Sequence, residues 1–89
     1  MAGRPSLIIY TLENCPNCEL LKNYLDRLGV TYTEEDMSGA ASLTELRVNG
    51  VFVEEAPVLR KNQVFLTSRD LFSAGKVRPE AITRCLEGA

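Results

Sequence analysis

The chain has 89 residues, of which 45% are hydrophobic, and its 10 Lys and Arg against 12 Asp and Glu give a formal net charge of −2. This length predicts one domain over residues 1–89, and the slight acidity disfavours nucleic acid as a partner, because phosphate binding needs a concentrated basic face. We expect no membrane span, since no apolar run approaches ~18–20 residues, and no secretory signal, since only a short apolar stretch follows Arg4.

The first predicted strand covers residues 7–11, a continuous apolar run of the kind that is buried on both faces of a sheet. A helix should follow, because Pro16 suits the first helical position and Gly29 suits the residue after the last turn. Apolar residues at spacings of three and four predict the buried stripe of this helix. The stripe consists of Leu20, Leu21, Tyr24, Leu25 and Leu28.

The middle of the chain predicts three further strands, with a helix between the first and the second of them. Residues 30–35 alternate apolar and polar side chains, which indicates a strand with one solvated face. Residues 40–48 predict a weaker helix, and residues 57–60 and 64–66 have the form of a β-hairpin. The first two strands would be parallel, in a right-handed βαβ unit, and the hairpin would extend the sheet with antiparallel strands.

The last part of the chain predicts two helices. Thr67 and Asp70 have the spacing of a capping box, and a short helix is expected over residues 70–74, ending at Gly75. Pro79 opens the final helix. Its inward side is predicted to carry Ile82, Cys85 and Leu86, with Gly88 closing it. The sequence therefore predicts an α/β fold with a four-stranded mixed sheet and helices on both faces.

Cys15-Pro16-Asn17-Cys18 lies where the first strand gives way to the first helix. At a helix N-terminus, free backbone N–H groups and the helix dipole favour a thiolate and lower a cysteine pKa from ~8.5 toward ~7 or below. Cys18 would lie one turn away, close enough to close a disulfide. Zinc is the alternative, but zinc takes four ligands, and the chain has no His and only Cys85 besides this pair. We therefore predict thiol–disulfide chemistry, in the cytosol.

The order of elements, with the two cysteines after the first strand and Ala56-Pro57 before the third, resembles the thioredoxin superfamily in its small, glutaredoxin-like form. The resemblance covers essentially the whole chain. It implies a thioredoxin-like fold and an enzyme that exchanges a dithiol for a disulfide. It also implies a cis Ala56–Pro57 bond against the cysteines, with the Ala56 backbone pairing with the substrate chain. A trans proline at the start of an edge strand is the alternative.

The position of the cysteine motif at the start of the helix predicts a role for each of its residues. Cys15 is expected to attack the substrate disulfide, and Cys18 to attack Cys15 and release the reduced substrate. Pro16 and Asn17, between them, would tune the reduction potential. The redox-active disulfide is expected to serve without a metal or another cofactor.

The surroundings of the motif differ from those of glutathione-binding glutaredoxins, which carry a basic residue before the cysteine loop. This chain has Glu13 there, and Glu54 and Glu55 precede Ala56. The carboxylates of glutathione would meet these acids, so the pattern is closer to small redoxins served by a thioredoxin-reductase-type enzyme. We expect a cytoplasmic monomer that reduces protein disulfides, with a reductase or, less favoured, glutathione as electron donor.

Two alternatives stay open. One is a glutathione-dependent glutaredoxin. The other is a non-catalytic module, either an interaction domain or a carrier of a [2Fe–2S] cluster bridged through Cys15. Outside the motif, Cys85 is expected to act as a small buried hydrophobe and Tyr10 to pack in the core. Glu54 and Glu55 would form a solvated loop face or an acidic rim around the site.

Overall fold

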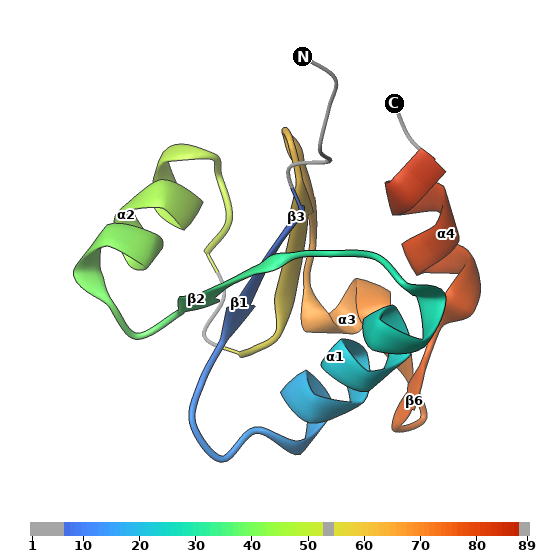
Figure 1. Cartoon of the computed structure of the whole chain (residues 1–89). Coiled ribbons are helices and arrows are strands. Elements are labelled where there is room, and N and C mark those ends of the chain that lie inside the picture. The colour runs from blue at the N-terminus through green and yellow to red at the C-terminus, as the bar shows by residue number, and fades with distance from the viewer. Residues whose placement is uncertain (1–6, 53–54, 88–89) are drawn as a thin grey trace.

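A four-stranded mixed sheet in the order β2-β1-β3-β4 organises the computed structural model, which describes residues 7–52 and 55–87 (Figure 1). Its central strand β1 pairs in parallel with β2 and antiparallel with β3, and β3 pairs antiparallel with β4. The strands are β1 (Leu7–Thr11), β2 (Thr33–Asp36), β3 (Val58–Lys61) and β4 (Val64–Leu66). The helices are α1 (Pro16–Leu28), α2 (Ala40–Val48), α3 (Ser68–Leu71) and α4 (Pro79–Glu87).

Helices cover both faces of this sheet, as predicted, and β1 contributes to a core on each side. On one face, Leu7 and Ile9 pack with residues of α1, α3 and α4. On the other face, Tyr10 packs with Leu46 of α2 and with Val58 of β3. Figure 1 shows α2 alone on its side of the sheet and the other three helices together on the opposite side. The apolar run at residues 7–11 is thus covered from both directions.

Helix α1 begins at Pro16 and ends before Gly29, which adopts φ 75° and closes the last turn through its N–H. Both ends agree with the prediction. The expected stripe is wrong at two positions, because Leu20 and Leu28 are 43% and 46% exposed. The buried residues of the helix are Cys18, Leu21 and Leu25. The face toward the sheet is therefore narrower than the leucine pattern indicates.

The second strand is shorter and more exposed than predicted. Residues 30–35 were expected to form it, whereas β2 spans Thr33–Asp36 and all four of its residues are exposed. Val30 and Tyr32 do pack against the core, but they precede the strand. Among the described strands, β2 lies at the edge of the sheet and pairs with β1 alone. No neighbouring strand therefore covers its other edge.

The segment after β4 contains a small hairpin that the sequence analysis missed. A helix was expected over residues 70–74, but α3 ends at Leu71, and β5 (Phe72–Ser73) pairs with β6 (Lys76–Val77). Ala74 and Gly75 form the turn with φ of 53° and 77°. Two consecutive positive φ angles suit the two-residue turns of tight hairpins. Alanine rarely adopts this conformation, so the turn carried no sequence signal.

The final helix α4 starts at Pro79 as predicted, and Ile82 and Cys85 are buried on its inner face while Leu86 packs beside them. The ammonium of Lys61 on β3 donates a hydrogen bond to the Leu86 carbonyl oxygen, near the helix C-terminus. Gly88 lies outside the described residues. Within residues 7–52 and 55–87, no helix combines the length and the apolar character needed to cross a membrane.

Candidate active site

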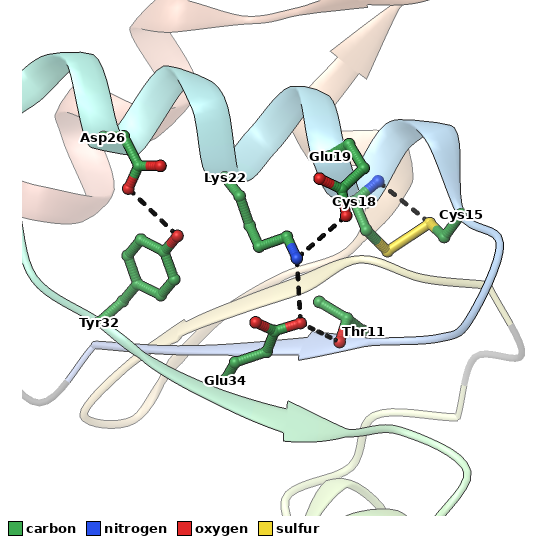
Figure 2. Close-up of polar contacts among 8 residues, drawn as sticks. All are labelled: Thr11, Cys15, Cys18, Glu19, Lys22, Asp26, Tyr32 and Glu34. Carbon is green, nitrogen blue, oxygen red and sulfur yellow. Dashed lines mark hydrogen bonds and ion pairs between the residues drawn. A yellow bond between two sulfur atoms is a disulfide. The ribbon is translucent and has the colours of Figure 1, made fainter.

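Cys15 and Cys18 form a disulfide at the junction between β1 and α1, with their Cα atoms 5.2 Å apart (Figure 2). The local sequence explains the geometry of this turn. Asn14 adopts a left-handed conformation with φ 54°, which asparagine tolerates better than most residues. Cys15 is then extended and serves as the N-cap, and Pro16 takes the first helical position.

The Cys15 sulfur occupies the place of a capping side chain. The backbone N–H of Cys18 donates to Cys15 Sγ over 3.0 Å, as such groups donate to the oxygen of a capping Ser or Asp. When the disulfide is reduced, the same N–H and the positive end of the α1 dipole face a Cys15 thiolate. These groups favour the nucleophilic form of this cysteine.

The two cysteines differ in their access to solvent. Cys18 is 1% exposed, whereas Cys15 is only partly buried and Pro16 beside it is exposed. A disulfide outside the protein can therefore approach Cys15, and it cannot approach Cys18 without rearrangement. The roles predicted for the two cysteines stay predictions, and this difference in access is the observation that supports them. Asn17, between them, is partly exposed.

The Ala56–Pro57 bond is cis, as predicted. Pro57 is buried at the start of β3. The carbonyl oxygen of Ala56 lies 3.8 Å from Cys15 Sγ. The structure thus places the loop before β3 directly against the outer cysteine, although the two segments are about forty residues apart in the sequence.

An open groove of about 900 Å³ runs beside the disulfide, between α1 and the ends of β1 and β2. It combines four carboxylates with one ammonium. Its lining consists of Thr11, Leu12, Glu13, Asn14, Cys15, Pro16, Cys18, Glu19, Lys22, Glu34 and Asp36. Thr11, Lys22 and Glu34 were not among the site residues predicted from the sequence. Lys22 could have been found from its spacing, because it follows Cys18 by four residues on a helix.

Of the two acidic residues before Ala56, the structure describes Glu55, and Glu54 lies outside the described residues. Glu55 is exposed, and its Oε1 accepts a hydrogen bond from Ser68 Oγ over 3.4 Å.

Tyr10 is buried on the α2 side of the sheet and accepts a hydrogen bond from Arg60 over 3.2 Å. Its predicted role in core packing is confirmed.

Cys85 is 4% exposed and packs in the core formed by α1, α3 and α4. Burial raises the pKa of its thiol, and the charge of Lys61 only partly opposes this effect. The inward position predicted for Cys85 is confirmed.

We expect the thiol of Cys85 to be unreactive in the folded protein, because it is both buried and protonated. With Cys15 and Cys18 joined, a colorimetric disulfide reagent should react with this thiol at least about a hundredfold more slowly than in denaturant. The measurement is a thiol titration of oxidised protein with and without denaturant. Rapid reaction of one thiol in the native protein would show that Cys85 is accessible.

The cysteine pair at the start of α1, the cis-proline before β3 and the mixed sheet together define a thiol–disulfide redox protein of thioredoxin-like fold. The glutaredoxin family model matches residues 7–66, about two thirds of the chain, and the chain belongs to this family. A search of curated proteins found no match to this sequence.

Proposed function

We propose that this protein reduces disulfide bonds in other proteins by exchange with the Cys15–Cys18 dithiol. The Cys15 thiolate attacks one substrate sulfur, the substrate S–S bond breaks, and the other substrate sulfur leaves as a thiolate that takes up a proton. Cys18 then loses its proton and attacks Cys15 Sγ. The second substrate sulfur is released, two electrons have passed to the substrate, and the protein is left as the disulfide.

The observation that carries this proposal is the position of Cys15 Sγ, which caps α1, accepts the Cys18 N–H and belongs to the more exposed of the two cysteines. Cys18 is buried one turn behind it. The arrangement favours attack by Cys15 first and resolution by Cys18 second, because only the outer sulfur is open to a substrate.

Ala56 is proposed to hold the substrate chain beside Cys15. Its carbonyl oxygen already lies at the sulfur, and an extended substrate segment could pair with this backbone as an added strand. Pro57 has no N–H, so it leaves no donor there to compete with the substrate. An extended protein segment fits this surface better than a small thiol, because it can use the backbone of Ala56 as well as the cysteine.

Charge also favours a protein disulfide over glutathione. Glu13, Glu19, Glu34 and Asp36 line the groove, against the single ammonium of Lys22. The carboxylates of glutathione would be repelled there. We therefore propose a flavin-dependent, thioredoxin-reductase-type enzyme as the electron donor. Membership of the glutaredoxin family keeps glutathione as the second candidate.

A paired turnover assay tests the choice of donor. Insulin serves as the protein disulfide, and NADPH is supplied through either thioredoxin reductase or glutathione with glutathione reductase. We expect insulin reduction at least about tenfold faster through thioredoxin reductase. Turnover with glutathione alone would overturn the proposed donor, and turnover with neither would overturn the proposed reduction of protein disulfides.

A further inference from the structure

A cluster of charged side chains lines the groove beside the disulfide. The Lys22 ammonium lies 3.0 Å from Glu19 Oε2 and 3.2 Å from Glu34 Oε2. The hydroxyl of Thr11 donates to the same Glu34 oxygen over 2.9 Å. Figure 2 shows Lys22 reaching from α1 across to Glu34, in the space between helix and sheet where the cysteine side chains also lie. The cluster thus joins α1, β1 and β2 next to the disulfide.

The cluster belongs to the same face of α1 as Cys18. Lys22 follows Cys18 by four residues, so its side chain stands about one turn along the helix from the buried sulfur. The Lys22 side chain is only 20% exposed, whereas those of Glu34 and Glu19 are 44% and 67% exposed. Lys22 is therefore the least exposed side chain of the three, and solvent screens its charge less than it screens a fully exposed one.

Their hydrogen bonds favour the ionised forms of both Lys22 and Glu34. The hydrogen bonds that the Lys22 ammonium donates to Glu19 and then to Glu34 raise the pKa of Lys22. Hydrogen bonds from Thr11 and then from Lys22 lower the pKa of Glu34. Between mildly acidic and alkaline pH the groove thus holds a fixed positive charge and a fixed negative charge that do not titrate with the cysteines.

Fixed charges beside the disulfide affect the equilibrium between the reduced dithiol and the disulfide. The reduced protein carries a negative charge on Cys15 once its thiol ionises, and the disulfide carries none. A nearby cation therefore stabilises the reduced thiolate relative to the disulfide, and a nearby anion does the opposite. Removing either charge changes the net charge beside the sulfurs by one unit, whether or not that charge is part of an ion pair.

We propose that Lys22 and Glu34 form an electrostatic control pair for the Cys15–Cys18 dithiol, in which the ammonium favours the reduced thiolate and the carboxylate opposes it. The pair acts through the cysteines, so both are positioning residues, and their role rests on the proposed redox function. The other charged residues that line this groove, among the described residues, are Glu13 on the loop before α1, Glu19 on α1 and Asp36 on β2.

The test uses the whole protein and three variants, Lys22→Met, Glu34→Gln and the double variant. The first readout is the rate of Cys15 alkylation by iodoacetamide against pH, located by peptide mapping. The second is the ratio of dithiol to disulfide at equilibrium with a dithiothreitol buffer. Neither readout needs a protein substrate or an enzymatic donor, so both can be measured even if the proposed function fails.

For Lys22→Met we expect the midpoint of the alkylation profile to move to higher pH by about half a pH unit or more. The dithiol-to-disulfide ratio should fall by about twofold to threefold. For Glu34→Gln both changes should have the opposite sign. The double variant should return close to wild type, because it removes one charge of each sign.

Two controls separate charge from structure. Lys22→Arg keeps the positive charge and should leave the alkylation midpoint near that of wild type. Arg27→Met removes a positive charge from the last turn of the same helix, outside the groove, and should shift neither readout. Shifts of the same sign in Lys22→Met and Glu34→Gln, or no shift in either, would overturn the proposal. Failure of wild-type protein to reduce insulin, with the opposite shifts present, would count against the proposed function alone.

Discussion

Replacing Cys15 by serine is expected to lower the rate of insulin reduction by at least about a hundredfold, because a serine hydroxyl at neutral pH is a far weaker nucleophile than a thiolate. The loss should appear in the assay driven by thioredoxin reductase without glutathione. Cys15 is the sulfur that caps α1 and is open to solvent, and Cys18, at 1% exposure, cannot take its place.

Cys18→Ser should stop turnover as completely, but for a different reason. Its Cys15 can still attack a substrate disulfide, and the resulting mixed disulfide has no neighbouring thiol to release it. Cys85→Ala is the matched control, since Cys85 is buried away from the groove, and it should retain activity within about twofold. Substantial insulin reduction by Cys15→Ser would remove the central assignment.

The second large effect concerns the stability of the helix that carries the cysteines. Leu21→Ala should lower the free energy of unfolding by about 2–5 kcal/mol, because a fully buried leucine leaves a cavity when truncated. Leu21 is 0% exposed and lies in the core shared by α1 and the sheet. Denaturant unfolding followed by circular dichroism measures the change.

Leu20→Ala provides the control one position earlier on the same helix. Leu20 is 43% exposed, and its truncation should change the free energy of unfolding by no more than about 0.5 kcal/mol. The two leucines had been assigned to the same stripe from their spacing. Equal destabilisation by both substitutions would contradict the orientation of α1 in this structure.

The sequence predicted the central part of the fold because its signals there are strong and local. The apolar run at residues 7–11 gave the central strand, and Pro16 and Gly29 marked the two ends of α1. The cysteine motif predicted a site at the strand–helix junction. The resemblance to known redoxins predicted the cis bond before Pro57, which the structure has. These features depend on residues close in sequence or on a recurring arrangement.

What the sequence missed depends on contacts between distant segments. Leu20 has the spacing of a core residue, but it lies outside both core clusters and is 43% exposed, which depends on how α1 packs against distant parts of the chain. The turn of the β5–β6 hairpin requires a positive φ at Ala74, and the conformational preference of alanine does not indicate one. The contact of Lys22 with Glu34 requires the register of β2 against β1, and this register could not be read from the chain.

The most direct test of whether Cys15 is the attacking thiol is to locate the mixed disulfide that Cys18→Ser protein traps. Cys18→Ser protein, reduced and mixed with a stoichiometric peptide disulfide, is analysed by intact mass and peptide mapping. We expect one adduct per chain, joined to Cys15 and released by dithiothreitol. An adduct on Cys85, or no adduct while the same peptide is reduced by the wild-type protein, would contradict the claim that Cys15 is the attacking thiol.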